Sequence, residues 1–142
     1  MDYLKVLVEE IHSVVVATVD ETGHPHTAVM DMMWEDGKTV YFLTADFKPL
    51  YKRLKEDGRV AVTGMTQGAG TMDRKSISLT GQVEWIGKEH LEELLKANPY
   101  MYEIYPTEEG RSHLQVFRFK NSVGNFYDLT QLPPYQARFE IE

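Results

Sequence analysis

The sequence contains no cysteine in its 142 residues. The chain therefore forms no disulfide and offers no thiol nucleophile, no cysteine-ligated zinc and no cysteine-held iron–sulfur cluster. A chain of this length buries enough apolar surface to fold without such cross-links. We expect residues 1–142 to form a single domain in a reducing compartment.

Long hydrophobic runs are also missing. No apolar segment approaches the roughly 20 residues that a membrane-spanning helix needs, although 42% of the residues are hydrophobic, as in an ordinary folded domain. The first twelve residues, MDYLKVLVEEIH, are acidic and amphipathic, whereas a signal peptide is basic and then apolar. We therefore expect a cytoplasmic protein without a membrane partner.

Positive charge is in deficit. Fifteen lysines and arginines face 22 aspartates and glutamates, for a net charge of −7, and a general nucleic-acid binder needs the opposite surplus. Residues 45–75 nevertheless carry a local charge of +3, leaving −10 for the rest. A basic island in an acidic chain predicts one small anionic ligand and no nucleic acid.

Recognisable nucleotide and metal motifs are absent too. The glycine-containing segment TQGAGTM (66–72) has neither the lysine of a phosphate-binding loop nor the third glycine of a dinucleotide fingerprint. His24 and His26 stand two residues apart, but no third ligand follows at a recognisable spacing. We read them as polar turn residues and expect no metal.

The stretch Thr39–Val62 organises the chain as a strand, a turn, a helix and a second strand. Pro49 sits early in a segment with apolar residues at helical spacing, so the helix is expected to start near residues 46–48. Free N–H groups in its first turn favour a phosphate or carboxylate. Lys48, Lys52 and Lys55 are spaced to share one helical face. This predicts an anion cradle, although a solvated lysine stripe would have the same spacing.

The remaining pattern is mainly β. A helix is expected over Asp2–Ile11 and another over Lys88–Ala97, with irregular structure from Pro99 to Ser112 and an extended tail after Leu132. Predicted strands are Ser13–Asp20, covered on both faces, Thr27–Trp34, Thr39–Thr44, Arg59–Met65, Lys75–Ile86, and a hairpin of Leu114–Lys120 and Val123–Thr130.

This predicts a mainly β (α+β) domain, a six- to seven-stranded antiparallel barrel with short flanking helices. Gly81, on the apolar face of its strand, indicates a bend or a close backbone approach. Because so small a barrel is filled by its own side chains, a ligand is expected on its outside or at a subunit interface.

Three segments carry a resemblance to a known family: SVVVATVDETGHPHTAVMD (13–31), VYFLTADFKPLYKRLKEDGRVAV (40–62) and RKSISLTGQVEW (74–85). In this order they resemble the FMN-binding split barrels related to pyridoxamine 5′-phosphate oxidase, including the nitroimidazole-resistance and general-stress branches. The resemblance implies a split barrel and a homodimer with two FMN molecules in clefts between the subunits.

The resemblance also implies roles for individual residues. Thr44 and Lys48 would hold the FMN phosphate, and Lys75 and Ser76 would reach the phosphate or the ring from the long strand. The backbone of Val29, Met30, Asp31 and Met32 would run along the ribityl chain and the flavin ring, with the methionine side chains packing nearby. Independently of the resemblance, Asp31 is an acid flanked by methionines in mid-strand, and its side chain is expected either at a dimer contact or in the cleft.

The chain departs from the oxidase branch at three places. Ala28 replaces a phosphate-binding arginine on the second strand, and Pro49 and Leu50 replace an arginine-lysine pair. The tail LTQLPPYQARFEIE does not reproduce the substrate-binding segment with arginine and histidine. These departures argue against pyridoxamine phosphate oxidation, and they leave Lys48 as the main phosphate ligand.

The function implied by the resemblance is reduction of small electron-poor molecules at a bound FMN, with a nicotinamide as electron donor. Because the flavin carries the redox chemistry, no catalytic residue is assigned. One alternative is a non-catalytic flavin- or haem-binding protein of the same fold. Another is an oligonucleotide-binding barrel, which the acidic composition disfavours.

Overall fold

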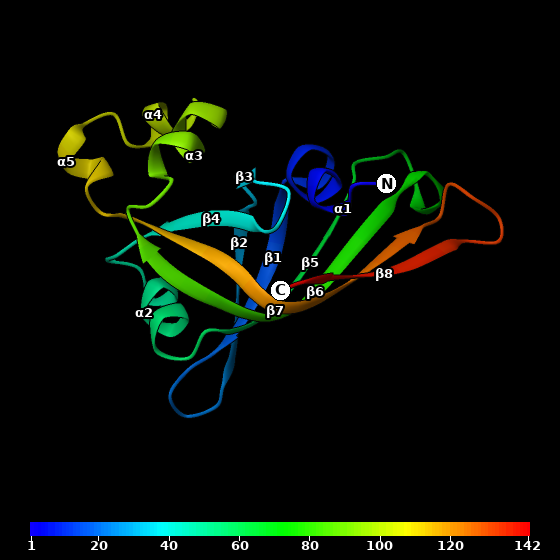
Figure 1. Cartoon of the computed structure of the whole chain (residues 1–142), viewed down its shortest axis with the longest axis horizontal. Coiled ribbons are helices and arrows are strands. Elements are labelled where there is room, and N and C mark those ends of the chain that lie inside the picture. Colours follow the sequence, from blue (N-terminus) through cyan, green and yellow to red (C-terminus); the bar gives the residue numbers. More distant parts are fainter.

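The computed structural model describes all residues from Met1 to Glu142 and shows one curled antiparallel sheet (Figure 1). The strand order is β2-β1-β5-β6-β7-β4-β3, with β8 paired to β7. The prediction of a mainly β antiparallel domain is confirmed. The strands are β1 (Ser13–Val19), β2 (Pro25–Asp31), β3 (Trp34–Glu35), β4 (Val40–Ala45), β5 (Arg59–Met65), β6 (Lys75–Gly87), β7 (Leu114–Asp128) and β8 (Tyr135–Ile141).

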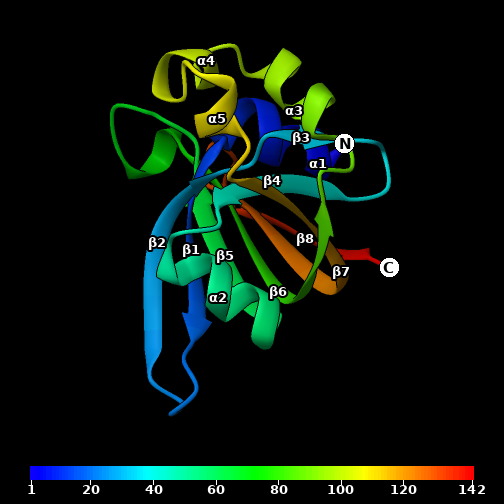
Figure 2. The ribbon, with the colours of Figure 1, turned by 90° about the vertical axis from the view of Figure 1, so that its left-hand side faces the viewer.

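Short helices flank the sheet on two sides. In both views α2 lies on one side of β4, and α3, α4 and α5 lie on the other (Figures 1 and 2). None of the helices combines the length and apolarity needed to cross a bilayer. They are α1 (Tyr3–Lys5), the π-helix η1 (Val6–Ile11), α2 (Pro49–Glu56), the 3₁₀ turn η2 (Thr71–Asp73), α3 (Leu91–Ala97), α4 (Met101–Ile104) and α5 (Glu108–Arg111).

Strand β4 is buried on both of its faces. Its inner face contributes Val40 and Phe42 to a 20-residue core inside the curl of the sheet. Its outer face contributes Tyr41 and Leu43 to a second core of nine residues, which the helices near Leu94 complete. The end of β4 is therefore fixed from both sides.

Strand β1, predicted to be covered on both faces, is covered on only one within this chain. Val14 and Val16 are 2% and 0% exposed, whereas Val15 between them is 41% exposed. A run of valines is expected in a strand that its own chain buries on both faces. The same run is expected in a strand that the chain buries on one face and that exposes an apolar second face. The outer face of β1 is open.

The predicted hairpin at Asn121-Ser122 is wrong, because β7 runs through both residues without turning back. Asn121 has a positive φ of 47°, and the pairing with β6 shifts register opposite Gly81. A Cβ on Gly81 would lie 2.3 Å from the Ser122 hydroxyl, which confirms the predicted close approach. Asn121-Ser122, which the sequence indicates as a turn, is thus an irregularity within one long strand.

The last hairpin instead joins β7 to β8, so the tail predicted to be extended is an eighth strand. Asp128, 2% exposed, closes the intervening turn. Its carboxylate accepts hydrogen bonds from the Thr130 N–H at 2.8 Å and hydroxyl at 2.6 Å, and from the Gln131 amide at 3.1 Å. The Thr130 hydroxyl is the main cause that holds the pKa of Asp128 below its usual range.

We predict that Asp128→Asn lowers the free energy of unfolding by about 1–2 kcal/mol at pH 7, because hydrogen bonds to a charged acceptor are lost. A depressed pKa in the folded state stabilises the protein above the unfolded value of about 3.9, and that contribution disappears as the pH falls through the folded value. Urea unfolding of both proteins at pH 7 and pH 3 measures this. If the variant is less stable than the wild-type protein by the same free energy at pH 3 as at pH 7, the stabilising role of the charged Asp128 carboxylate is contradicted.

Candidate functional site

The predicted phosphate site lies where the chain passes from β4 into α2. Lys48 is the N-cap of α2, with an extended backbone, and Pro49 occupies the first helical position. The helix thus starts within a residue of its predicted position. The exposed Lys48 ammonium forms no ion pair, hydrogen bond or cation–π contact within the chain. A free cation beside a helix N-terminus suits an anion.

Thr44 lies four residues before Lys48 and is 3% exposed. It pairs with Gln115 of β7 and shares a strand face with Phe42. Its hydroxyl oxygen is buried without a hydrogen-bond partner. An unsatisfied buried hydroxyl costs about 1–3 kcal/mol. The predicted ligand pair thus comprises an unpaired hydroxyl and an unpaired cation on consecutive elements, which fits a phosphate group.

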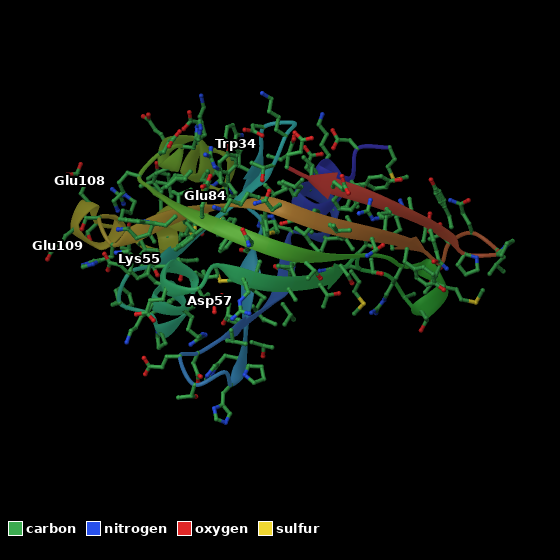
Figure 3. The ribbon with its side chains drawn as sticks, turned by 60° about the horizontal axis from the view of Figure 1, so that its bottom comes forward. Trp34, Lys55, Asp57, Glu84, Glu108 and Glu109 are labelled. Atoms are coloured by element: carbon green, nitrogen blue, oxygen red, sulfur yellow. The ribbon has the colours of Figure 1, made fainter.

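The three lysines predicted to share one face do not act together. Lys55, labelled in Figure 3, places its ammonium 4.4 Å from the centre of the Trp85 ring and 5.6 Å from that of Tyr51. Lys52 instead borders a hollow of about 240 Å³ near His26. The predicted cradle therefore contains Lys48 but not Lys55. Helical spacing does not apply to Lys48, because this residue lies before the first helical turn and has an extended backbone.

The free edge of β2 leads away from this cradle. His26, near the start of β2, lines the same hollow as Pro49, and β2 pairs with β1 on its other edge only. The Met32 N–H donates to the His12 carbonyl at 2.7 Å. In an antiparallel ladder this bond makes Asp31 and Val29 non-hydrogen-bonded partners of β1, so their backbone groups face the open edge.

The other residues predicted along the flavin play a different part in the chain. Met30 is half-buried against the inner core, and Met32 is fully buried within it. The Met32 N–H is already bonded to His12. Of the four predicted residues, only Val29 and Asp31 present unpaired backbone groups at the edge of the sheet.

Lys75 and Ser76 lie at the far end of the sheet. Lys75 pairs with Asp128 at one end of β6, whereas Trp85 near the other end pairs with Phe117, close to where Ala45 pairs with β7. Ten residues of strand span about 33 Å. Lys75 is instead 3.6 Å from Glu10. A single chain therefore does not bring Lys75 and Ser76 together with Thr44 and Lys48.

The Asp31 side chain belongs to a polar cluster that sequence reasoning missed. One carboxylate oxygen accepts a 2.7 Å hydrogen bond from Ser13, and the other accepts one from the Tyr100 hydroxyl at 2.7 Å. His12 lies 3.5 Å from Asp31 and 2.8 Å from the Tyr100 oxygen. His12 and Tyr100 are 88 residues apart, so no sequence spacing could relate them.

The histidines of the β1–β2 turn bond within that turn. His26 Nε2 lies 2.8 Å from Asp20, and His24 Nδ1 lies 2.8 Å from the Thr22 hydroxyl. The hydrogen bond from His26 is the largest cause that holds the pKa of Asp20 far below its usual range. Both side chains thus serve as polar turn residues.

We predict that Thr44→Val raises the free energy of unfolding of the cofactor-free protein by about 1 kcal/mol, because it removes an unsatisfied buried hydroxyl. Thr39→Val is the matched control, since the Thr39 hydroxyl donates to the Phe119 carbonyl at 2.7 Å, and its loss should cost about 1 kcal/mol. Urea denaturation measures both. Equal destabilisation by the two substitutions would show that Thr44 has a partner.

Solved structures with the same fold bind more than one kind of cofactor. A NimC/NimA family protein from Clostridium acetobutylicum superposes with a TM-score of 0.75 at 19% identity, over 98% of this chain and 93% of that one. A heme-binding protein from Mycobacterium smegmatis gives 0.73 at 13% identity, over 98% of this chain and 57% of that one. An FMN-binding protein related to pyridoxamine 5′-phosphate oxidase from Nostoc punctiforme gives 0.65 at 11% identity, over 91% and 80%.

At these identities the structural likeness concerns the fold. No curated protein matches the sequence significantly. The model of the pyridoxamine 5′-phosphate oxidase family, however, matches residues 2–127, which include β1 to β6 and nearly all of β7. The chain therefore belongs to the pyridoxamine 5′-phosphate oxidase family.

Proposed function

We propose that this protein is a dimeric FMN flavoprotein that reduces small electron-poor molecules, with a nicotinamide as electron donor. The observation that carries the proposal is the buried, unpartnered Thr44 hydroxyl, which lies four residues before the free Lys48 at the N-cap of α2. A phosphate beside Lys48 would supply the acceptor that the Thr44 hydroxyl lacks, provided that binding opens access to this buried group. The FMN-binding relative from Nostoc punctiforme supports this choice of cofactor.

The protein's own part is to bind and orient the cofactor. Lys48 and Thr44 would hold the phosphate, and the free backbone groups of Val29 and Asp31 would bond the polar edge of the ribityl chain and ring. When bound, the flavin supplies the hydride chemistry. The edge of β2 runs from His26, near α2, to Asp31, and so gives an extended ligand one defined direction.

The proposed dimer would cover the open face of the sheet. Two rows of outward side chains cross β2, β1, β5 and β6, and none of these side chains is charged. They are Val29, Val15, Thr63 and Ser78 in one row and Thr27, Ala17, Ala61 and Thr80 in the other. A largely apolar hollow of about 320 Å³ lies in the same face. An uncharged sheet face of this extent suits a protein interface.

A second copy on this face would also explain the distant pair of predicted ligands. Lys75 and Ser76 are too far from Lys48 to act on one phosphate within a chain. In a dimer they would instead reach a cofactor bound mainly by the other subunit. The dimer and the shared cofactor are therefore a single proposal.

A second candidate is a binding protein of the same fold that carries flavin or haem without turnover. The heme-binding relative from Mycobacterium smegmatis favours it, because its TM-score of 0.73 is close to that of the NimC/NimA protein. The visible spectrum of the purified protein separates the cofactors. Two flavin bands, alone or after FMN is added, support flavin, whereas a Soret band supports haem. Turnover with a nicotinamide and a nitroaromatic then distinguishes an enzyme from a carrier, and a colourless protein that takes up no FMN contradicts the proposal.

We predict that Lys48→Ala weakens FMN binding by about 1–3 kcal/mol, because a charge-assisted phosphate contact is lost. Lys55→Ala is the matched control, since it removes the same charge from the same segment but from the Trp85 ring. Fluorescence titration with FMN measures both affinities. If Lys55→Ala weakens binding as much as Lys48→Ala does, the effect is one of general charge and the phosphate site lies elsewhere.

We predict that Val15→Asp shifts the protein from dimer to monomer, because it places a charge at the centre of the uncharged sheet face. Light scattering after gel filtration measures the mass. Ile104→Asp, at a 60% exposed apolar residue on α4, is the control and should leave the dimer intact. A Val15→Asp protein with unchanged mass would show that this face is not the interface.

A further inference from the structure

His12, Asp31 and Tyr100 form a hydrogen-bonded chain contributed by three separate parts of the fold. His12 ends the π-helix η1, Asp31 ends β2, and Tyr100 precedes α4. The Tyr100 oxygen stands between the other two, 2.8 Å from His12 Nε2 and 2.7 Å from Asp31 Oδ2. His12 and Asp31 are part-exposed, at 30% and 27% of their side chains.

The backbone holds His12 in a costly conformation. Its φ is 63° and its ψ is −65°, a region that non-glycine residues rarely enter and that costs on the order of 1–3 kcal/mol. It follows a six-residue π-helix, and π-helical turns concentrate at functional sites. The His12 N–H bonds Leu7, and its carbonyl accepts from Met32. The strain places the imidazole against Tyr100.

The opposite side of the cluster is held just as firmly. Asn98, 5% exposed, donates its amide to the Met33 and Leu94 carbonyls, both at 2.8 Å. This fixes the turn that carries Tyr100. Burial, followed by the hydrogen bond to Asp31, raises the pKa of Tyr100. Tyr100 therefore stays a neutral hydroxyl donor.

Counting protons shows that this chain can store one. His12 Nδ1 lies 3.0 Å from the Val8 carbonyl, which can only accept, so Nδ1 carries a hydrogen. When the imidazole is neutral, the single hydroxyl proton of Tyr100 can be donated either to His12 Nε2 or to Asp31, but not to both. One added proton on Nε2 satisfies every contact, because His12 then donates to Tyr100 and Tyr100 donates to Asp31. Loss of that proton leaves the contact between His12 Nε2 and the Tyr100 oxygen without a hydrogen as long as Tyr100 donates to Asp31.

The cluster sits at the end of the β2 edge along which we propose that the cofactor binds. Asp31 is the last residue of β2, and His26 near the start of β2 lines the same hollow as Pro49 and Lys52 of α2. Five residues of strand separate His26 from Asp31, about 17 Å. A cofactor with its phosphate at Lys48 would therefore direct its ring towards Asp31. Asp31 and Tyr100 are the only ionisable partners of His12, while Glu10 on the same helix pairs with Lys75.

We propose that Tyr100 is the proton donor for reduction at the edge of β2 and that His12, held by the Val8 carbonyl, returns a proton to it. This rests on the proposed function. A bound reduced flavin would supply the hydride. The Tyr100 hydroxyl would give its proton to the resulting anion as the His12 Nε2 proton moves to the Tyr100 oxygen. Neutral His12 then takes a proton from solvent. Each turnover thus consumes one hydride and one proton.

The proton arrangement is tested first by ¹⁵N NMR of the histidine rings in the purified protein. We expect neutral His12 as the Nδ1–H tautomer, because Nδ1 faces the Val8 carbonyl. Asp31→Asn should change the Nε2 resonance of His12 in the wild-type background. It should not do so in Tyr100→Phe, because the Tyr100 hydroxyl is the group that joins the two residues. Neutral His12 found as the Nε2–H tautomer would overturn the proposal, since its Nε2 could not then take up a proton.

The donor role is tested by stopped-flow reduction of a nitroaromatic by the FMN-loaded, pre-reduced protein. Tyr100→Phe should slow the step at least about 100-fold and abolish its solvent isotope effect. Tyr102→Phe, at an exposed tyrosine on α4, should change neither. FMN binding by Tyr100→Phe with an unaltered rate overturns the relay alone. Failure of the wild-type protein to bind FMN overturns the proposed function and the relay with it.

Discussion

The burial of β4 on both faces is the constraint on which the rest of the structure depends. The inner core holds one face of the strand and the helices after β6 hold the other. The chain therefore leaves β4 at a fixed point, and Pro49 starts α2 within four residues. This geometry places Lys48 at the start of the helix. It also buries the Thr44 side chain, which is 3% exposed. The same burial that stabilises the fold leaves a hydroxyl without a partner.

Curling of the sheet produces the second element of the site. β2 lies near β4 without pairing to it, so one strand edge stays open beside α2. Unpaired backbone groups on an edge strand normally invite another chain or a ligand. The open edge begins near α2 and ends at Asp31, where His12 and Tyr100 form their hydrogen-bonded chain. The proposed phosphate site, the open edge of β2 and the proposed proton donor would thus follow one another along the molecule.

Much of this was predictable from local rules. Pro49 in a segment of helical spacing located the helix start, alternation located β6, and Gly81 located the close approach to Ser122. Each of these features depends on residues that are neighbours in the sequence, and for this reason the sequence predicts them. The hairpin prediction failed because Asn121 adopts the positive φ of a turn residue inside a strand that continues.

Long-range relations were the part that sequence reasoning could not supply. His12 and Tyr100 meet across 88 residues through a π-helix and a strained φ that no residue preference signals. Lys75 resembled a ligand of the same phosphate as Lys48, but register through β6 and β7 places them at opposite ends of the sheet. The valines of β1 predicted burial on both faces, and the chain itself covers only one of them.

The most direct measurement of the central claim compares FMN with riboflavin, which lacks only the phosphate, by calorimetric titration of the cofactor-free protein. If Thr44 and Lys48 bind the phosphate, FMN should bind at least about tenfold more tightly, because each hydrogen bond to a charged group contributes about 1.5–3 kcal/mol. The advantage should shrink in salt, which screens the exposed Lys48. Equal affinity for the two flavins would contradict the account.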